Sequence, residues 1–381
     1  MTSVRDISIW HITHDMDERA GGIPAVVRQL SKQLKSKCID NNILYANGDA
    51  GEVQYCSSVK CFPSSGVASS WCYSRGLRSS ISEIIGQGRS LCNLMCHIHG
   101  VWSAPQYYGA LEARRSSVPY LVSAHGMLEP WLWNKQGALK YLKKKLYWST
   151  FAYPAFKHAD VIHAITPLEK KHLVELFPAS RIEVIPNAIH VPPLQDQALT
   201  RPSRRLLFLG RLEPKKGIHL LLEAFSIARI DSDWILDVVG PSWSSKYLSV
   251  LKSIVANRKL EKRVHFHDAV FAETKEKLIR EAWTMIVPSY SEVVGLVNLE
   301  AAVNCTPTIT THETGLYNWA DGGGMLVSTD IEAIATAIED VCNWSADERV
   351  SQGLASRKLV EEHYSWQVVL PKWIKLYSSL V

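Results

Sequence analysis

The sequence lacks any uninterrupted apolar run near the roughly 20 residues that a membrane-spanning helix needs. Its first residues also lack the apolar core of a signal peptide, because charged residues such as Arg5 and Asp6 stand there. The eight cysteines are irregularly spaced, which favours reduced thiols over a disulfide framework. With 46% hydrophobic and 21% charged residues, the composition argues against a disordered, collagen-like or coiled-coil chain. We therefore expect a globular, cytoplasmic protein.

Positive charge is unevenly distributed along the 381 residues. The segment 1–190 carries 21 Lys and Arg against 14 Asp and Glu, whereas 191–381 carries 21 against 23. A basic first half favours an anionic partner such as a membrane surface or a phosphorylated substrate. Nucleic acid is not expected, since no basic stripe interleaved with aromatic residues is present.

Short apolar runs alternate with amphipathic stretches through both halves of the chain. The segments 6–11, 95–99 and 160–164 read as strands, and 23–34 reads as a helix. A proline-rich linker at 186–203 separates this alternation from a second one, with strands at 205–209 and 234–239. This pattern predicts an α/β protein of two Rossmann-like βαβ domains, 1–190 and 191–365, with a ligand cleft between them. A final helix, about 366–381 and broken near Pro371, is expected to pack back on the first domain.

A phosphate site is indicated where the strand at 205–209 meets the next helix. Gly210 ends the strand, Arg211 and Lys216 are cationic, and Gly217 opens the helix. Two cations beside a helix N-terminus suit a phosphate group. The spacing is neither a Walker A loop nor a dinucleotide-binding glycine turn. A solvated loop that carries two basic residues is the alternative.

Two carboxylates flank the start of a later helix. Glu292 lies in a loop, and Glu300 lies on the helix that begins near Gly295. Both can face one site beside the backbone N–H groups of 293–296, where sugar hydroxyls or a phosphate would bind. Glutamates also stabilise a helix start without any ligand, so the pair alone is weak evidence.

Taken together, these motifs make the chain similar to the retaining glycosyltransferases of family four, which have the GT-B fold. The resemblance spans almost the whole chain, in the order of the family. The matching residues are Gly21-Gly22, His125-Gly126, Pro186-Asn187, Gly210-Arg211-Leu212, Lys216-Gly217, and Glu292 with Glu300 in an E-x7-E pattern.

The resemblance implies a role for each matched residue. Arg211 and Lys216 would hold the donor diphosphate, and Glu300 would bind the nucleotide ribose. Glu292 and His125 would contact the donor sugar. Further donor-binding positions are Gly21, Gly22, Asn187, Gly210, Val293, Val294, Gly295 and Leu296.

The resemblance also implies a reaction that needs no metal and no cofactor, with front-face attack and retention at the transferred carbon. Two positions depart from the family. Val293-Val294 replaces a small residue followed by an aromatic one. Val303-Asn304-Cys305 stands where the family has an Ala-Cys-Gly-type stretch, so the usual glycine is absent. These changes weaken any inference about which sugar is transferred.

A cluster of thiols and imidazoles at 92–99 (CNLMCHIH) raises the question of a zinc site. A strand there would point alternate residues to opposite faces, which disfavours a shared ion. His99 and Trp102, at the end of this strand, are candidate acceptor contacts, and a buried histidine and a packing tryptophan are the alternative. The segment 312–314 follows another expected strand and is a candidate for the nucleotide side.

The stretch 128–147 combines aromatic residues with a run of lysines, as interfacial helices do. A solvated helix with one packed side is the alternative. We expect a transferase that moves a sugar from a UDP- or GDP-sugar to a lipid-linked saccharide acceptor, at the inner face of a bacterial membrane during synthesis of O-antigen, capsule or exopolysaccharide. A non-catalytic protein that binds sugar nucleotides is the rival, and an epimerase of the same fold fits less well.

Overall fold

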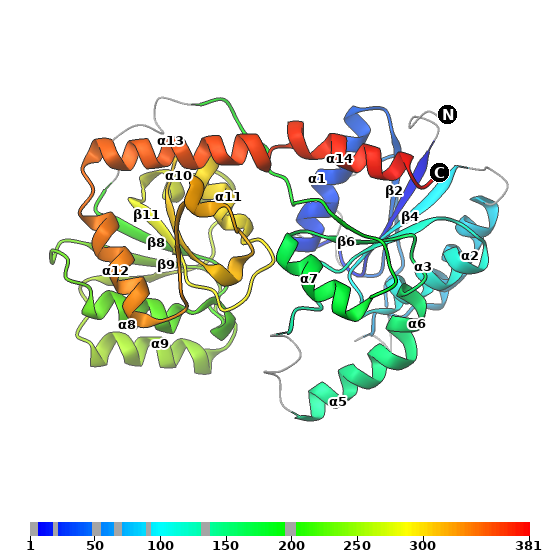
Figure 1. Cartoon of the computed structure of the whole chain (residues 1–381). Helices are drawn as coiled ribbons and strands as arrows, with labels where there is room; N and C mark the ends of the chain where they lie inside the picture. Colours follow the sequence, from blue (N-terminus) through cyan, green and yellow to red (C-terminus); the bar gives the residue numbers. More distant parts are fainter. Residues whose placement is uncertain are drawn as a thin grey trace. The chain divides into compact units, whose positions relative to one another are not determined.

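The computed structural model describes residues 7–17, 22–47, 55–64, 71–88, 93–130, 138–194 and 203–381. The chain divides into two compact units (Figure 1). The N-terminal unit comprises Met1–Ala188 and Val369–Val381, and the C-terminal unit comprises Ile189–Val368. Within the described residues, no helix is both long and apolar enough to cross a membrane.

The N-terminal unit is built on a seven-stranded sheet in the order β3-β2-β1-β4-β5-β6-β7. Every pairing among its described strands is parallel. Its strands are β1 (Ser8–Ile12), β2 (Asp40–Tyr45), β3 (Ser58–Cys61), β4 (Leu94–His99), β5 (Tyr120–Ser123), β6 (Val161–Ala164) and β7 (Ile182–Val184). Its helices are α1 (Gly22–Ser36), α2 (Arg75–Gly88), α3 (Ala104–Arg115), α5 (Ala138–Tyr147), the π-helical turn η4 (Trp148–Ala152), α6 (Tyr153–Phe156) and α7 (Pro167–Leu176).

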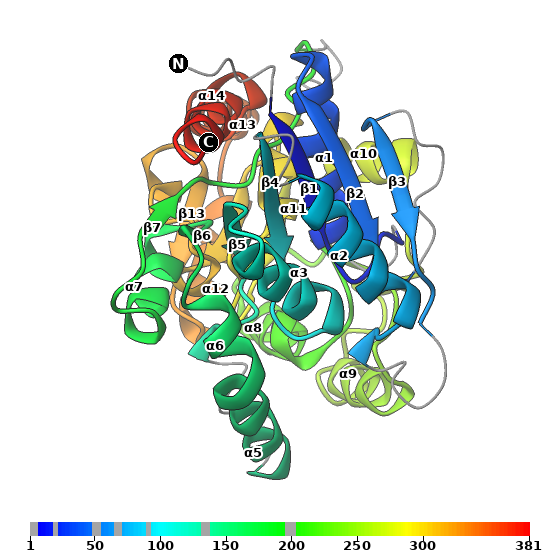
Figure 2. The ribbon, with the colours of Figure 1, turned by 90° about the vertical axis from the view of Figure 1, so that its right-hand side faces the viewer.

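The two faces of this sheet differ in character. On one face, Ile98 and Val122 pack in an apolar core with Leu77 of α2 and Ala110 of α3. Figure 2 shows α2, α3 and α6 on the near side of the sheet. Because side chains alternate along a strand, His97 and His99 of β4 point to the opposite face. That face is unusually polar.

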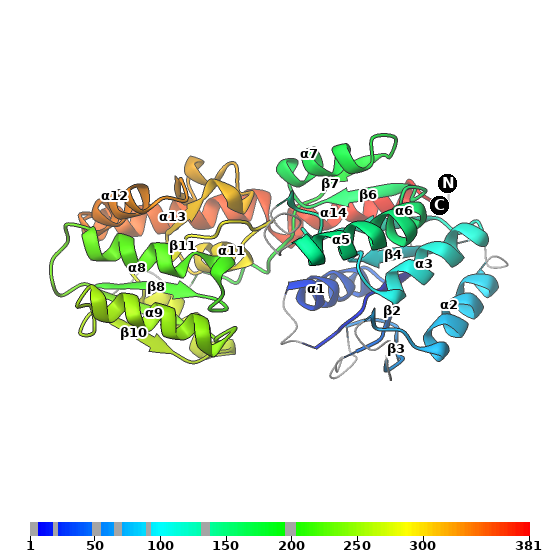
Figure 3. The same cartoon turned by 90° about the horizontal axis from the view of Figure 1, so that it is seen from below.

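The C-terminal unit is built on a six-stranded parallel sheet in the order β10-β9-β8-β11-β12-β13, and in Figure 3 α8 and α9 run alongside β8. Its strands are β8 (Arg205–Leu209), β9 (Ile235–Val239), β10 (Val264–His267), β11 (Thr284–Val287), β12 (Thr308–Thr311) and β13 (Gly324–Val327). Its helical segments are η6 (Pro214–Lys216), α8 (Ile218–Ile227), α9 (Ser245–Asn257), α10 (Ala272–Glu281), α11 (Leu296–Val303), η7 (His312–Thr314), η8 (Trp319–Asp321), α12 (Ile331–Cys342) and α13 (Ala346–His363).

Alternation along β8 shows that this second sheet is covered on both faces. Leu206 and Phe208 pack with residues of α8, α9 and α12. Leu207 and Leu209 pack instead with residues of α10 and α11. Each unit therefore has the doubly wound architecture, in which functional groups collect beyond the carboxyl ends of the strands. The expectation of two parallel α/β domains is confirmed.

The last helix departs from the expectation of a break near Pro371. Helix α14 (Trp366–Ser378) is continuous and carries Pro371 inside it. Pro371 is the sixth residue of the helix, so its missing N–H removes only one backbone hydrogen bond, while packing of the flanking residues continues on both sides. The part of α14 from Val369 onward belongs to the N-terminal unit.

Candidate functional site

The predicted phosphate turn lies at the carboxyl end of β8. Gly210 follows the strand, η6 carries Lys216, and Gly217 starts α8 in the left-handed conformation with φ 68°. A Cβ on Gly217 would overlap the carbonyl oxygen of Pro288, which follows β11. Glycine therefore lets two neighbouring strand-to-helix turns approach each other closely.

The second turn joins β11 to α11 and holds Glu292. The backbone N–H of Tyr290 donates to the carbonyl of Lys215 at 2.9 Å, which ties the two turns together. The backbone N–H of Glu292 donates to the carbonyl of Glu313 at 2.9 Å, so the turn η7 is also adjacent. The structure thus brings the loosely predicted segment 312–314 to the same place as Glu292.

Lys216 and Glu292 form an ion pair between the two turns. The Lys216 ammonium and the Glu292 carboxylate are both largely buried, and the Ser289 hydroxyl lies 3.3 Å from the same carboxylate oxygen. Burial alone raises the pKa of the Glu292 carboxyl, but the ammonium groups of Lys216 and Lys215 outweigh burial and hold this pKa below its usual value. Glu292 is therefore ionised at neutral pH and fixes the Lys216 ammonium beside the helix start.

Arg211 and Glu300 lie in the same unit but have other partners. The guanidinium of Arg211 is mostly exposed and lies 3.4 Å from the carboxylate of Glu213. Glu300, on α11, pairs with Lys275 of α10 at 2.6 Å. Lys275 does not stand out in the sequence, because only the tertiary packing of α10 against α11 brings it to Glu300.

The start of α11 carries four more of the predicted donor-binding residues. Gly295 caps the helix, Leu296 is its first residue, Val294 is buried and Val293 is half-buried. A Cβ on Gly295 would press on the Asn298 side-chain amide, which would have to shift to make room. The branched side chain of Val294 packs inward, and its presence does not disturb the helix start.

In the N-terminal unit, His125 stands in a tight turn just after β5. His125 and Gly126 both have left-handed backbones, with φ 52° and 72°. Buried Glu169 holds this turn, because its carboxylate accepts hydrogen bonds of 2.7 Å from the N–H groups of Gly126 and Ile165. The turn that presents His125 is thus fixed from beneath by a buried carboxylate, which the sequence analysis missed.

The two candidate acceptor residues occupy different surroundings. His99 has no exposed surface, and its Nδ1 lies 2.9 Å from Nε2 of His125. The expectation that His99 contacts an acceptor directly is therefore wrong for this structure: as the last residue of β4 it points into the polar face of the sheet. Trp102 is half-buried, donates from its indole N–H to the Met127 carbonyl at 3.1 Å and packs beside Trp148. Its acceptor role stays a prediction.

Three of the predicted donor-binding residues belong to the N-terminal unit. Gly21 lies outside the described residues. Gly22 is the first residue of α1 and is exposed. Asn187 is half-buried in the N-terminal unit, between β7 and the unit boundary at Ala188.

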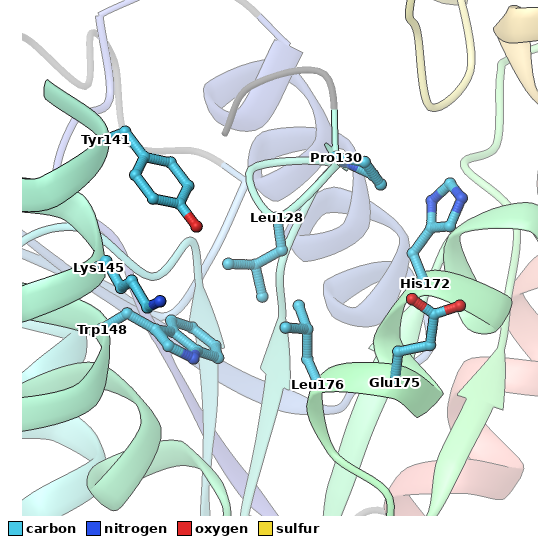
Figure 4. Close-up of a pocket in the computed structure, with 8 residues that line it drawn as sticks. All are labelled: Leu128, Pro130, Tyr141, Lys145, Trp148, His172, Glu175 and Leu176. Carbon is cyan, nitrogen blue, oxygen red and sulfur yellow. The ribbon is translucent and has the colours of Figure 1, made fainter. Parts of the chain in front are cut away.

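A pocket of about 310 Å³ lies beside α5 in the N-terminal unit (Figure 4). Its wall includes the aromatic rings of Tyr141 and Trp148 and the charged groups of Lys145 and Glu175. Its remaining lining residues are Leu128, Pro130, His172 and Leu176. Figures 1 and 2 both show α5 projecting from the body of this unit.

Comparison with protein-family models assigns both units. Residues 20–191 match the model described as glycosyltransferase family 4. Residues 195–358 match the model described as glycosyl transferases group 1. The two matches together span most of the chain.

Curated relatives with this similarity are bacterial glycosyltransferases. A GDP-mannose:cellobiosyl-diphosphopolyprenol alpha-mannosyltransferase of Xanthomonas oryzae is 26% identical over 74% of this chain and 73% of that protein. A D-inositol 3-phosphate glycosyltransferase of Corynebacterium efficiens is 29% identical over 58% of this chain and 57% of that protein. The chain thus matches little more than half the length of the second relative.

Solved structures reproduce the fold over nearly the whole chain. Sucrose-phosphate synthase of Thermosynechococcus elongatus has a TM-score of 0.74 and 19% identity, covering 98% of this chain and 99% of that one. Anabaena HepE in complex with UDP has a TM-score of 0.75 and 14% identity, covering 98% of this chain and 100% of that one. At these identities the likeness defines the fold.

Proposed function

The chain belongs to the GT-B glycosyltransferases of family 4, and we propose that it transfers a sugar from a UDP- or GDP-sugar to a saccharide acceptor with retention. The observation that carries this proposal is the pairing of Lys216 with Glu292 across two strand-to-helix turns. An ionised carboxylate and a fixed ammonium group suit the two parts of a nucleotide-sugar, its hydroxyl-rich ring and its diphosphate.

In the proposed reaction, the bond between the sugar C1 and the diphosphate oxygen breaks and a bond from C1 to the acceptor oxygen forms on the same face. The acceptor hydroxyl proton passes to the departing phosphate oxygen. Lys216 and Arg211 stabilise the negative charge that grows on that phosphate. Glu292 orients the sugar, Glu300 binds the ribose, and His125 is retained as a further contact to the sugar. No metal or cofactor is assigned a role in this scheme.

The nucleotide half of the proposal can be tested without an acceptor. Purified protein would be melted with UDP, GDP, ADP, dTDP and CMP, since a ligand that binds only the folded state raises the Tm. At 100 times its Kd, a nucleotide adds about 2.7 kcal/mol to the free energy of unfolding. We expect a shift with UDP or GDP, without added metal.

Two variants locate the binding site, each with a matched control. Arg211→Ala and Glu300→Gln should abolish the nucleotide shift. Arg258→Ala and Glu276→Gln remove the same groups from surface ion pairs of the same unit and should leave it unchanged. A protein that no nucleotide stabilises lacks the proposed donor site. Binding without hydrolysis or transfer of any nucleotide-sugar favours the rival, a non-catalytic binding protein.

The acceptor side of the proposal rests on helix α5. Leu142 and Leu146 of this helix are 63% and 62% exposed. On a helical wheel, Lys143 and Lys145 flank these two leucines, and the segment 138–158 contains no Asp or Glu. Exposed apolar residues between lysines complement an anionic lipid surface. We therefore place a lipid-linked saccharide acceptor here, with its sugar in the pocket between Tyr141 and Trp148.

This acceptor assignment agrees with the diphosphopolyprenol in the name of the Xanthomonas relative, and with a role in bacterial cell-surface polysaccharide synthesis. Its test is sedimentation with liposomes of neutral lipid with and without anionic lipid, at low salt. We expect binding only to anionic vesicles and its loss in Lys143→Gln/Lys145→Gln. The control Lys252→Gln/Lys262→Gln removes the same charge from exposed positions of the C-terminal unit. Equal binding by both double variants, or no binding by the wild type, contradicts the membrane assignment.

A further inference from the structure

Four histidines and a serine form a polar row on one face of the N-terminal sheet. By strand register, His11 of β1 lies beside His97 of β4, and His99 lies beside Ser123 of β5, which lies beside His163 of β6. All five are buried. Trp373 and Tyr377 of α14 pack against this row. Burying so many polar groups is costly unless they are hydrogen-bonded, so the hydrogen-bond partner of each ring nitrogen matters.

One part of the row forms a closed chain of hydrogen bonds. Nε2 of His163 lies 2.8 Å from the carbonyl of Ile185, which can only accept, so Nε2 carries the proton. Nδ1 of His163 then accepts from Ser123 at 2.8 Å, and Ser123 accepts from Nε2 of His97 at 2.7 Å. Nδ1 of His97 accepts from the Tyr377 hydroxyl at 2.9 Å. Each ring nitrogen in this series of hydrogen bonds has a partner, and the series helps to hold α14 against the sheet.

The other part of the row leads to His125. Nδ1 of His11 lies 2.9 Å from Nε2 of His99, and Nδ1 of His99 lies 2.9 Å from Nε2 of His125. His125 is the outer member, because it alone of the three has exposed surface. Burial lowers the pKa of His11 and of His125 to about 3 and that of His99 well below its usual value, so all three rings are neutral at neutral pH.

Three neutral rings can share the two hydrogen bonds in only two directions. If His125 donates to His99 and His99 donates to His11, Nε2 of His11 is left as a buried N–H. That atom has no hydrogen-bond partner among the described residues. If His11 donates instead, the unpaired atom is a lone pair, which is less unfavourable than an orphaned N–H group. The second direction leaves the proton of His125 on Nδ1.

We propose that His11 and His99 are positioning residues that hold His125 as the Nδ1–H tautomer, so that His125 donates a hydrogen bond to an oxygen of the donor sugar. This inference rests on the proposed function for the identity of the oxygen. The hydrogen bond made by one ring nitrogen of a histidine determines whether the other nitrogen carries the proton. Neutral His125 would then act as a hydrogen-bond donor, and it would not serve as a proton donor at neutral pH.

Binding of a metal ion by the same residues is the competing use. His11, His97 and His99 each place one nitrogen within 4.8 Å of the others. Both nitrogens of His97 and of His99 are already hydrogen-bonded, and their ring centroids lie 3.9 Å apart with the ring planes tilted by 32°. Ligands of one ion converge on it, whereas these rings lie side by side. The geometry therefore favours the hydrogen-bonded relay.

The backbone of His125 is held independently of its ring. Glu169 fixes the N–H of Gly126, so the turn keeps its shape when the ring loses its partner. Substitutions at His11 should thus change the orientation and tautomer of the imidazole without dismantling the turn. This separation makes the proposal testable, because His11 has no exposed surface and cannot contact a substrate itself.

The tautomer can be observed directly in the free protein. Long-range nitrogen–proton correlation spectra of histidine-labelled protein would report which ring nitrogen carries the proton, with His125 assigned from the spectrum of His125→Gln. We expect His125 with Nδ1 protonated in the wild type and a changed tautomer population in His11→Leu. Finding Nε2 protonated, or no change in His11→Leu, overturns the proposal whatever the enzyme's substrate.

Kinetics supply the second readout, using hydrolysis of a nucleotide-sugar that carries the nucleotide identified in the thermal-shift screen. His11→Leu should lower kcat by about 10-fold, the lower end of the loss seen when an outer hydrogen-bond partner of a metal-ligating residue is removed. His11→Asn should recover most of it, since the amide nitrogen takes the place of Nδ1. Nucleotide affinity should stay unchanged in both, because Arg211, Lys216 and Glu300, the proposed contacts to the diphosphate and ribose, lie on the C-terminal unit.

Two controls complete the experiment. His163→Leu removes an equally buried histidine outside the relay, so it should lower stability but leave kcat unchanged. Equal losses of kcat in His163→Leu and His11→Leu would assign the effect to packing and contradict the relay. Metal analysis of the purified protein forms the last arm: one equivalent of tightly bound ion that is lost in His11→Leu would replace the relay by a metal site. Loss of nucleotide binding in the wild type would defeat the proposed function while leaving the tautomer result intact.

Discussion

At the scale of single residues, the ion pair between Lys216 and Glu292 connects two turns that are 76 positions apart in the chain. Both groups are largely buried, so each depends on the other for its charge to be tolerated. Removing one partner of such a pair leaves an uncompensated charge, whereas removing both can be nearly neutral. The pair therefore has separable contributions to stability and to binding.

We predict that Lys216→Met lowers the free energy of unfolding by about 3 kcal/mol, the lower end for a broken buried pair, because the Glu292 carboxylate loses its ion-pair partner. The double variant Lys216→Met/Glu292→Leu should recover most of this stability and still fail to bind nucleotide. Chemical denaturation followed by fluorescence measures the first effect, and the nucleotide thermal shift measures the second. A double variant that binds nucleotide would show that the pair is only structural.

Residue identities at this site were predictable, and their partners were not. Arg211, Lys216, Glu292 and Glu300 stand out in the sequence through their motifs. That Glu300 pairs with Lys275 depends on how α10 packs against α11, which no local pattern encodes. The histidine relay was also missed, because it joins strands whose neighbourhood is set by the sheet order.

At the scale of elements, the turn from β8 to α8 depends on Gly217. Its φ of 68° disfavours other residues, and a Cβ would collide with the carbonyl of Pro288. The collision is with backbone, so it cannot be relieved by a side-chain rotation. The close approach of the β8 and β11 turns thus requires glycine at this position.

We predict that Gly217→Ala lowers the free energy of unfolding by about 1–3 kcal/mol, the usual cost of a residue in a strained backbone conformation. It should also weaken nucleotide binding, because the turn that carries Lys216 must move away from β11. Gly353→Ala is not a suitable control, since that position also meets backbone. Gly86→Ala, where a Cβ inside helix α2 meets open space, should not lower stability and should leave nucleotide affinity unchanged. A fully stable Gly217→Ala protein with normal nucleotide affinity would contradict this account.

Most elements follow from sequence periodicity, and the exceptions have physical reasons. The edge strands β3, β7 and β13 were missed because each is only three or four residues long and shows no clear alternation. Pro371 led to the opposite error, because the sequence predicted a helix break there that the structure does not have. Proline breaks a helix in isolation, but α14 is held on both sides of Pro371 by buried residues such as Trp366 and Tyr377.

At the scale of the whole molecule, the two units hold very different numbers of buried neutral histidines. The N-terminal unit contains the polar row and His125, and burial lowers the pKa of each of these imidazoles, for example to about 4 in His163. In the C-terminal unit, His219 alone among the described residues has a pKa lowered in this way. The units should therefore respond differently to acid.

We predict that the N-terminal unit unfolds first as the pH falls below about 6.5. The unfolded histidines bind protons there while the folded ones do not, so the unfolded state gains protons and stability decreases with falling pH. Glu169 opposes this trend, because burial raises its pKa to about 7 and the folded state therefore binds a proton there before the unfolded state does. This single carboxyl group is outweighed by the five buried histidines. Calorimetry between pH 7.5 and 5 should show one transition moving to lower temperature. Transitions that shift together would contradict the prediction.

The place of α14 in the chain has a consequence for biosynthesis. The residues that cover the histidine row belong to Val369–Val381, so they leave the ribosome after the whole of Ile189–Val368. Domains usually mature in the order of their synthesis. Here the order is reversed. The C-terminal unit can fold while the N-terminal sheet is still incomplete, and its row of imidazoles stays exposed to water until α14 has been synthesised.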